Sequence, residues 1–139
     1  GEFEFEISKL AEQGMPINHD VLSKKMIELY KTYYGIDIEE EKVKPLVWAY
    51  IPHLFYTPFY VYQYATSFTS SMLIYEKVKK GEPHAFENYI KMLSSGGGDW
   101  PIEEVKLGGV DLTTKEPFLS VTNRMEELVD SLEKLLEEK

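Results

Sequence analysis

Apolar residues at the start of the chain fit both a strand and a helix. Residues 2–8 alternate strictly between polar and apolar positions, which is the pattern of a strand with one buried face. The same stretch also places four apolar residues at the three-and-four spacing of one helical face, Phe3, Ile7, Leu10 and Ala11. Gly14 and Pro16 then supply the stop signals typical of a helix end. We therefore predict that this segment is a helix.

A second amphipathic segment extends from Asn18 to about Tyr34. Asparagine is favoured at helix N-caps, and Gly35 is typical of the residue that follows a helix. The apolar positions predicted to face inward are Leu22, Met26, Leu29 and Tyr33. The acidic run at residues 37–41, together with Pro45, predicts a solvated connector after this helix.

The middle of the chain is rich in aromatic residues and contains two prolines. Pro52 and Pro58 each restrict the residue before them to extended backbone. We therefore expect residues 53–57 to form a bent loop. A helix is then predicted to begin at Pro58, with Thr57 as its cap, and to continue to about Lys80.

Gly81 is expected to end that helix, and two shorter helices should follow. The first opens at Glu82 or Pro83 and ends near Leu93, because its apolar residues recur with a helical period. Its predicted inward positions are Phe86, Tyr89, Ile90 and Leu93. The second is a short helix over residues 101–107.

Between these two helices, residues 94–99 break regular structure with three consecutive glycines, Gly96 to Gly98. A glycine run can cradle a phosphate, but this one lacks the lysine and spacing of a P-loop and follows a helix rather than a strand. A flexible turn is therefore the favoured interpretation.

A long final helix is predicted to start near Thr114 and Pro117. Its apolar residues repeat at alternating threes and fours, Phe118, Val121, Met125, Leu128, Leu132 and Leu135. No internal repeat is apparent, and the predicted fold class is all-α, with residues 1–139 forming a single helical unit.

Composition and charge remove several classes of function. The chain of 139 residues is long enough for one domain with a real core, and no apolar run reaches the roughly 20 residues of a membrane span. A net charge of −9 disfavours nucleic acid as a partner. Cysteine is absent, which excludes disulfides and thiolate zinc sites and fits a reducing compartment. Because the sequence starts with Gly1 rather than Met, we expect an excised or processed piece of a longer protein.

The three histidines do not form a metal site by themselves. A helical zinc site of the His-Glu-x-x-His type needs two imidazoles four residues apart, and no such string occurs in residues 1–139. His19 and His84 are predicted near helix starts, where an exposed residue is the simpler interpretation. We therefore expect this chain to bind no metal.

His53 differs because of its tyrosine neighbours, Tyr56, Tyr60, Tyr62 and Tyr64. A phenol aimed into a cleft can donate a hydrogen bond to a developing oxyanion while remaining uncharged at neutral pH. Amphipathic tyrosines also commonly bury their rings and let the hydroxyl find a backbone partner. Composition alone favours the second interpretation, because an aromatic stripe at helical spacing is more often part of a core than of an active site.

The segment at residues 51–67, IPHLFYTPFYVYQYATS, closely resembles oligoendopeptidase F, a family of thimet-oligopeptidase-like zinc metallopeptidases. Further segments are similar to the C-terminal third of that family, namely residues 2–7, 33–35, 95–97 before Pro101, and 107–111. The resemblance covers nearly the whole chain. It implies that residues 1–139 are the helical C-terminal part of a zincin-type catalytic domain.

In that family, zinc is bound by His-Glu-x-x-His and a later glutamate, which the resemblance places before Gly1. In such enzymes zinc polarises the scissile carbonyl and activates the attacking water, and the upstream glutamate accepts the proton of that water. Histidine and tyrosine donors on the opposite side of the cleft stabilise the oxyanion. The resemblance assigns the catalytic donor role to His53 and Tyr62, and we choose Tyr56 as the second oxyanion donor. Tyr60 is a supporting candidate for substrate contact. Our further hypothesis is that the aromatic residues, Gly96 and Gly97 line a cleft that admits short peptides and excludes folded proteins.

The resulting expectation is a fragment of a cytoplasmic zinc metalloendopeptidase that hydrolyses oligopeptides, inactive when isolated. Exposed apolar surface on such a fragment is expected to drive self-association. Two alternatives stay open: a non-enzymatic helical interaction module, whose tyrosines bind a protein partner, and an inactive homologue of the peptidase.

Overall fold

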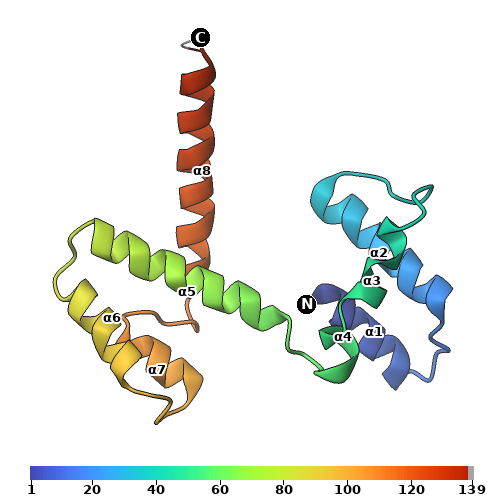
Figure 1. Ribbon diagram of the computed structural model, residues 1–139, viewed down its shortest axis with the longest axis horizontal. Helices are drawn as coiled ribbons and strands as arrows, with labels where there is room; N and C mark the ends of the chain where they lie inside the picture. Colours follow the sequence, from blue (N-terminus) through green and yellow to red (C-terminus); the bar gives the residue numbers. More distant parts are fainter. Residues whose placement is uncertain (138–139) are drawn as a thin grey trace. The chain divides into compact units, whose positions relative to one another are not determined.

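The computed structural model of the chain describes residues 1–137 and contains helices and loops but no strand within that range (Figure 1). The predicted all-α class is therefore confirmed. The chain divides into two compact units, residues 1–63 and 64–139. No helix within the described part has the length and apolar character needed to cross a membrane.

The first unit is built on two helices that pack around a small apolar core. Helix α1 spans Glu2–Glu12 and α2 spans His19–Tyr34, and the buried residues between them are Phe3, Leu22 and Met26. Both ends of α2 lie where the sequence places them. The Asn18 side chain accepts a hydrogen bond from the Val21 N–H at 3.0 Å, and Gly35 has the left-handed backbone of a helix C-cap.

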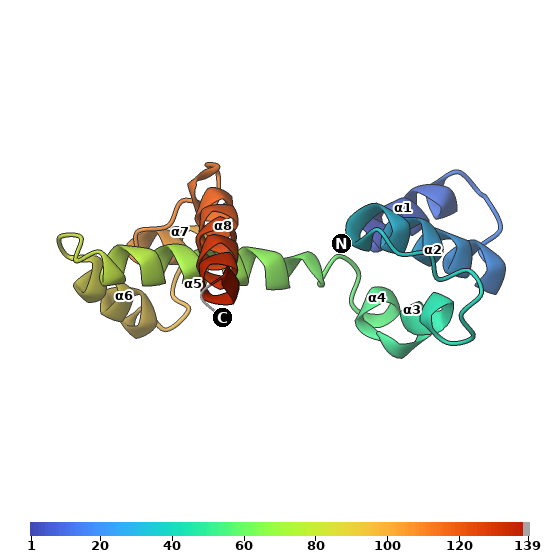
Figure 2. The same ribbon diagram turned by 90° about the horizontal axis from the view of Figure 1, so that it is seen from above.

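Three short elements complete the first unit: the 3-10 turn η1 at Lys44–Leu46, α3 at Val47–Tyr50 and α4 at His53–Tyr56. Figure 2 shows α3 and α4 on one side of the pair formed by α1 and α2. Before them, the acidic connector is mostly exposed but holds Ile38, which is almost completely buried.

Three predictions for the first unit are wrong. Tyr33 does not face the core but is 66% exposed, with its hydroxyl donating to the Glu2 carboxylate. Residues 53–56 form one helical turn rather than a bent loop, because Pro52 has helical backbone and its carbonyl accepts from the Phe55 and Tyr56 N–H groups at 3.0 Å. The next helix does not open at Pro58.

That helix, α5, spans Tyr62–Lys79 and so begins four residues later than predicted. The delay has a backbone cause, because Phe59 has a φ of 56° and therefore cannot lie in a right-handed helix. Gly81, with a φ of 69°, ends the helical segment as predicted.

The second unit contains most of α5 together with α6 at Ala85–Ser94, α7 at Pro101–Leu107 and α8 at Glu116–Glu137. Its core consists of Leu73, Ile74 and Val110, against which pack Tyr89, Met92, Val105 and Leu112. Gly108 lies close to this core, because a Cβ at that position would lie 2.8 Å from the Met92 sulfur and 3.3 Å from the Val105 carbonyl oxygen.

The inward face predicted for α6 is largely wrong. Tyr89 packs against the core, but Phe86, Ile90 and Leu93 are exposed. Helix α8 is also exposed along its predicted apolar stripe from Met125 to Leu135, and Figure 1 shows it projecting from the rest of the second unit. Both helices present apolar faces that other parts of the described chain do not cover.

Candidate functional site

The aromatic segment of the first unit is anchored to the core by two residues. The Trp48 indole N–H donates to the Ser23 hydroxyl at 3.1 Å, and the Trp48 ring meets Phe55 edge-on with centroids 6.1 Å apart. Leu54 packs against the core of α1 and α2. Helix α4 is a single turn, so its side chains point in different directions. Leu54 faces the core, whereas His53 and Tyr56 are exposed.

His53 and Tyr60 come together on that exposed side. Their rings stack with centroids 5.5 Å apart and planes inclined by 18°. The backbone turns back between them, since the Tyr60 N–H donates to the Thr57 carbonyl at 3.2 Å. The structure thus joins one predicted catalytic residue to one predicted substrate-binding residue.

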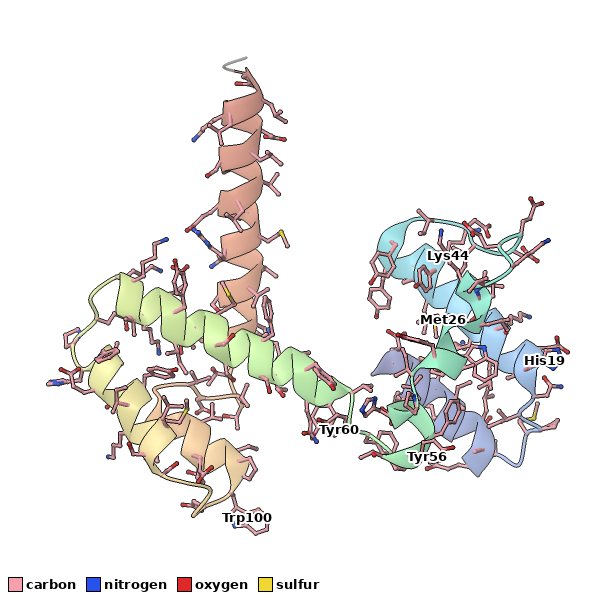
Figure 3. The ribbon with its side chains drawn as sticks, in the orientation of Figure 1. His19, Met26, Lys44, Tyr56, Tyr60 and Trp100 are labelled. Carbon is pink, nitrogen blue, oxygen red and sulfur yellow. The ribbon has the colours of Figure 1, made fainter. Side chains whose placement is uncertain are left out.

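Tyr56 and Tyr62 lie on either side of this turn. Tyr56 ends α4 and is 84% exposed, and Figure 3 labels it beside Tyr60. Tyr62 is the first residue of α5 and is also exposed. A Cβ at Gly1 would lie 3.7 Å from the Tyr62 Cβ, so the start of α1 abuts the start of α5.

One functional candidate was missed by the sequence interpretation. Glu4 of α1 is only 5% exposed, and its carboxylate accepts a hydrogen bond from the backbone N–H of Phe59. The alternation of glutamate and phenylalanine in residues 2–6 does not distinguish this carboxylate from its neighbours Glu2 and Glu6. No signal in the sequence identified it.

Gly96 and Gly97 belong to the second unit, where both have left-handed backbone with φ of 67° and 78°. Glu104 of α7 closes their loop, because its carboxylate accepts from the Ser95 hydroxyl and the Asp99 N–H, each at 3.3 Å. The loop leads to Trp100, which is 79% exposed (Figure 3). The glycine run is thus a turn, as predicted.

A groove of about 430 Å³ in the second unit contains none of the predicted site residues. Its walls come from α5, from the loop that follows α5, and from α8, and they carry a network of ion pairs. Arg124 lies 3.8 Å from Glu76 and 2.9 Å from Glu127, and Lys77 lies 3.2 Å from Glu116. The pairs Arg124–Glu76 and Lys77–Glu116 therefore join α8 to α5.

The segment 53–62 offers hydrogen-bond donors from one imidazole and three tyrosine hydroxyls. Such donors can stabilise an anion by hydrogen bonding. Among residues 1–137, no three histidine, aspartate or glutamate side chains are grouped so that they could hold a metal ion.

Comparisons with known proteins match this chain over nearly its whole length. It is 37% identical to an oligoendopeptidase F homologue of Borreliella burgdorferi and 36% identical to the oligopeptidase PepF of Bacillus subtilis, over 91% and 97% of the chain. It spans only 22% and 20% of the length of those relatives.

A solved structure also matches nearly the whole chain. The crystal structure of oligoendopeptidase-F from Enterococcus faecium matches with a TM-score of 0.89 and 33% identity, covering 99% of this chain and 26% of that protein. The model of peptidase family M3 matches residues 1–124. The chain therefore belongs to peptidase family M3.

Proposed function

We propose that residues 1–139 form the C-terminal part of the catalytic domain of an oligoendopeptidase F-type metalloendopeptidase. The observation that carries this proposal is the close structural match to oligoendopeptidase-F over almost the entire chain. The small share of each relative that is covered supports a fragment of a larger enzyme. By itself the fragment is expected to be inactive.

In this proposal His53, Tyr56 and Tyr62 are the catalytic donors. Peptide hydrolysis passes through a tetrahedral intermediate whose carbonyl oxygen becomes negatively charged. Neutral donors fixed around that oxygen lower the barrier, because they are already oriented when the charge appears. The exposure of His53, Tyr56 and Tyr62 supports this role, because polar atoms at the surface can contact a substrate.

Zinc is proposed as the metal of the complete protein, with ligands outside this chain. The described residues do not fit a zinc site, because they contain no group of three potential ligands. His53 also stacks on Tyr60 rather than meeting a second ligand. Accordingly, His53 acts here as a hydrogen-bond donor and not as a metal ligand.

The proposed substrates are short oligopeptides, contacted by Tyr60, Gly96 and Gly97. A Cβ added at either of the two left-handed glycines would meet no neighbouring atom within 4 Å, which leaves room for an extended peptide beside this backbone. We place the parent protein in the cytoplasm, because a cysteine-free chain suits a reducing compartment.

The test uses the full-length protein and a quenched fluorescent oligopeptide. Hydrolysis is expected with zinc, is lost on chelation and returns when zinc is restored, whereas residues 1–139 alone give none. A folded, zinc-loaded parent that fails to cleave a panel of oligopeptides would contradict the proposal and favour an inactive homologue or a helical interaction module. Cleavage of intact folded proteins would contradict the restriction to short peptides.

For the isolated chain we propose self-association through α8, with a second copy as the occupant of its apolar face. Five exposed apolar residues follow a heptad-like spacing, Phe118, Met125, Leu128, Leu132 and Leu135. The acidic residues of α8 at 126, 127, 130, 133 and 137 lie at other positions of the repeat. Two copies can therefore pair without bringing like charges into the seam.

A further inference from the structure

Within residues 1–137, the carboxylate of Glu4 is buried without a compensating cation. Glu4 is 5% exposed, and no lysine, arginine or histidine nitrogen in that range forms an ion pair with it. Burying a charged group is costly unless hydrogen bonds replace its water. The burial of Glu4 therefore depends on the hydrogen-bond donors that contact its carboxylate.

The backbone N–H of Phe59, which lies 55 residues further along the chain, donates to this carboxylate. Phe59 has left-handed backbone, with φ of 56°, and bulky residues rarely adopt this conformation. Such a torsion persists only where surrounding contacts enforce it. A hydrogen bond from an amide to a carboxylate is among the stronger kinds, so Glu4 is suited to hold this turn.

The turn at Phe59 decides where the proposed donors lie. It connects α4, which carries His53 and Tyr56, to Tyr60 and to the start of α5 at Tyr62. The stacking of Tyr60 on His53 requires the chain to reverse at this point. If Phe59 relaxed to right-handed backbone, Tyr60 and Tyr62 would leave their present positions relative to His53.

We propose that Glu4 is a positioning residue, whose carboxylate clamps the Phe59 turn and thereby sets the arrangement of His53, Tyr60 and Tyr62. The inference rests on the proposed peptidase function, and Glu4 itself need not touch the substrate. It assigns a role to a residue of α1 that is remote in sequence from the aromatic segment.

The test compares Glu4→Ala, Glu4→Gln and the control Glu6→Ala in the full-length protein. Glu6 belongs to the same helix, but its carboxylate pairs with Lys9 at 3.2 Å near the surface. Glu4→Ala should lower kcat by about 100-fold, the scale of a small misplacement of reacting groups, with KM nearly unchanged. Glu4→Gln keeps an acceptor oxygen and should recover most of this loss, and Glu6→Ala should match wild type.

A second variant separates positioning from general destabilisation. Glycine adopts left-handed backbone freely, so Phe59→Gly combined with Glu4→Ala should be more active than Glu4→Ala alone. Equal kcat for Glu4→Ala and wild type, or an additive loss in the double variant, would overturn the inference.

Amide exchange at Phe59 provides a readout that does not depend on activity. The Phe59 N–H should be protected in wild type and in Glu6→Ala, and exposed in Glu4→Ala. An unprotected Phe59 amide in wild type would contradict the proposed hydrogen bond between Phe59 and Glu4 and would overturn the inference. A wild type with a protected amide but no peptidase turnover would instead count against the proposed function, and with it against the catalytic consequence of the clamp.

Discussion

The first three glutamates of α1 have three different partners. Glu2 accepts from the Tyr33 hydroxyl, Glu4 accepts from a backbone amide, and Glu6 pairs with Lys9. The contact with Glu2 raises the pKa of Tyr33, because the carboxylate accepts the phenolic hydrogen and disfavours a phenolate beside it. A helix turns successive side chains by about 100°, so residues that alternate in sequence do not share one environment.

At the residue scale, Asp111 carries a pH-dependent contribution to stability. Its carboxylate accepts from the Thr113 hydroxyl at 2.6 Å and from the Thr113 N–H at 2.9 Å, which lowers the pKa of Asp111. A lowered folded-state pKa stabilises the fold above the unfolded pKa of about 4, and this contribution is lost as the pH falls through the folded value.

The variant Asp111→Asn tests the direction of this pH dependence. Urea unfolding should show wild type more stable than the variant at pH 7, with the difference disappearing as the pH falls well below 4. Asp130→Asn is a control, because Asp130 is exposed on the surface of α8. A difference between wild type and Asp111→Asn that is independent of pH would contradict the account.

At the element scale, the start of α2 depends on one side chain. Asn18 accepts from the Val21 N–H and satisfies a donor that the helix leaves unpaired. Asn18→Ala should lower the free energy of unfolding by about 1 kcal/mol, whereas Asn18→Ser should retain most of it. Urea unfolding measures both variants, and an alanine variant as stable as wild type would show that the cap is not needed.

The elements also show what the sequence could and could not predict. The ends of α2 depend on local signals at Asn18 and Gly35, and both were predicted correctly. The start of α5 was misplaced, because the torsion of Phe59 is tied to Glu4 through a contact that no local rule reports. Likewise, the sequence singled out the aromatic segment, but the stacking of Tyr60 on His53 required the fold.

In the whole molecule, α6 and α8 both have exposed apolar faces, and this explains why the inward positions of α6 were misjudged. Helical periodicity indicates that one face of a helix is buried, but it does not identify the element that covers this face. In this chain, Leu93 of α6 and Leu132 of α8 remain exposed. The small share of each relative that the chain covers is consistent with partners in the remainder of a longer protein.

The proposed pairing of two α8 helices makes a prediction for the isolated chain. Sedimentation of residues 1–139 should show a mass that rises with concentration towards a dimer. Leu128→Glu with Leu132→Glu should give a monomer at every concentration, because charge then enters the seam. Glu133→Gln, off the seam, should behave as wild type. A wild-type chain that stays monomeric, or a double variant that still associates, would contradict this pairing.

We propose that hydrogen-bond donors of residues 53–62 stabilise the oxyanion that forms during peptide hydrolysis. The most direct test is Tyr62→Phe in the full-length protein, which removes one hydroxyl and keeps the ring. We expect kcat to fall by about 100- to 1,000-fold, with KM and thermal stability nearly unchanged. A Tyr62→Phe enzyme with wild-type kcat would contradict this proposal.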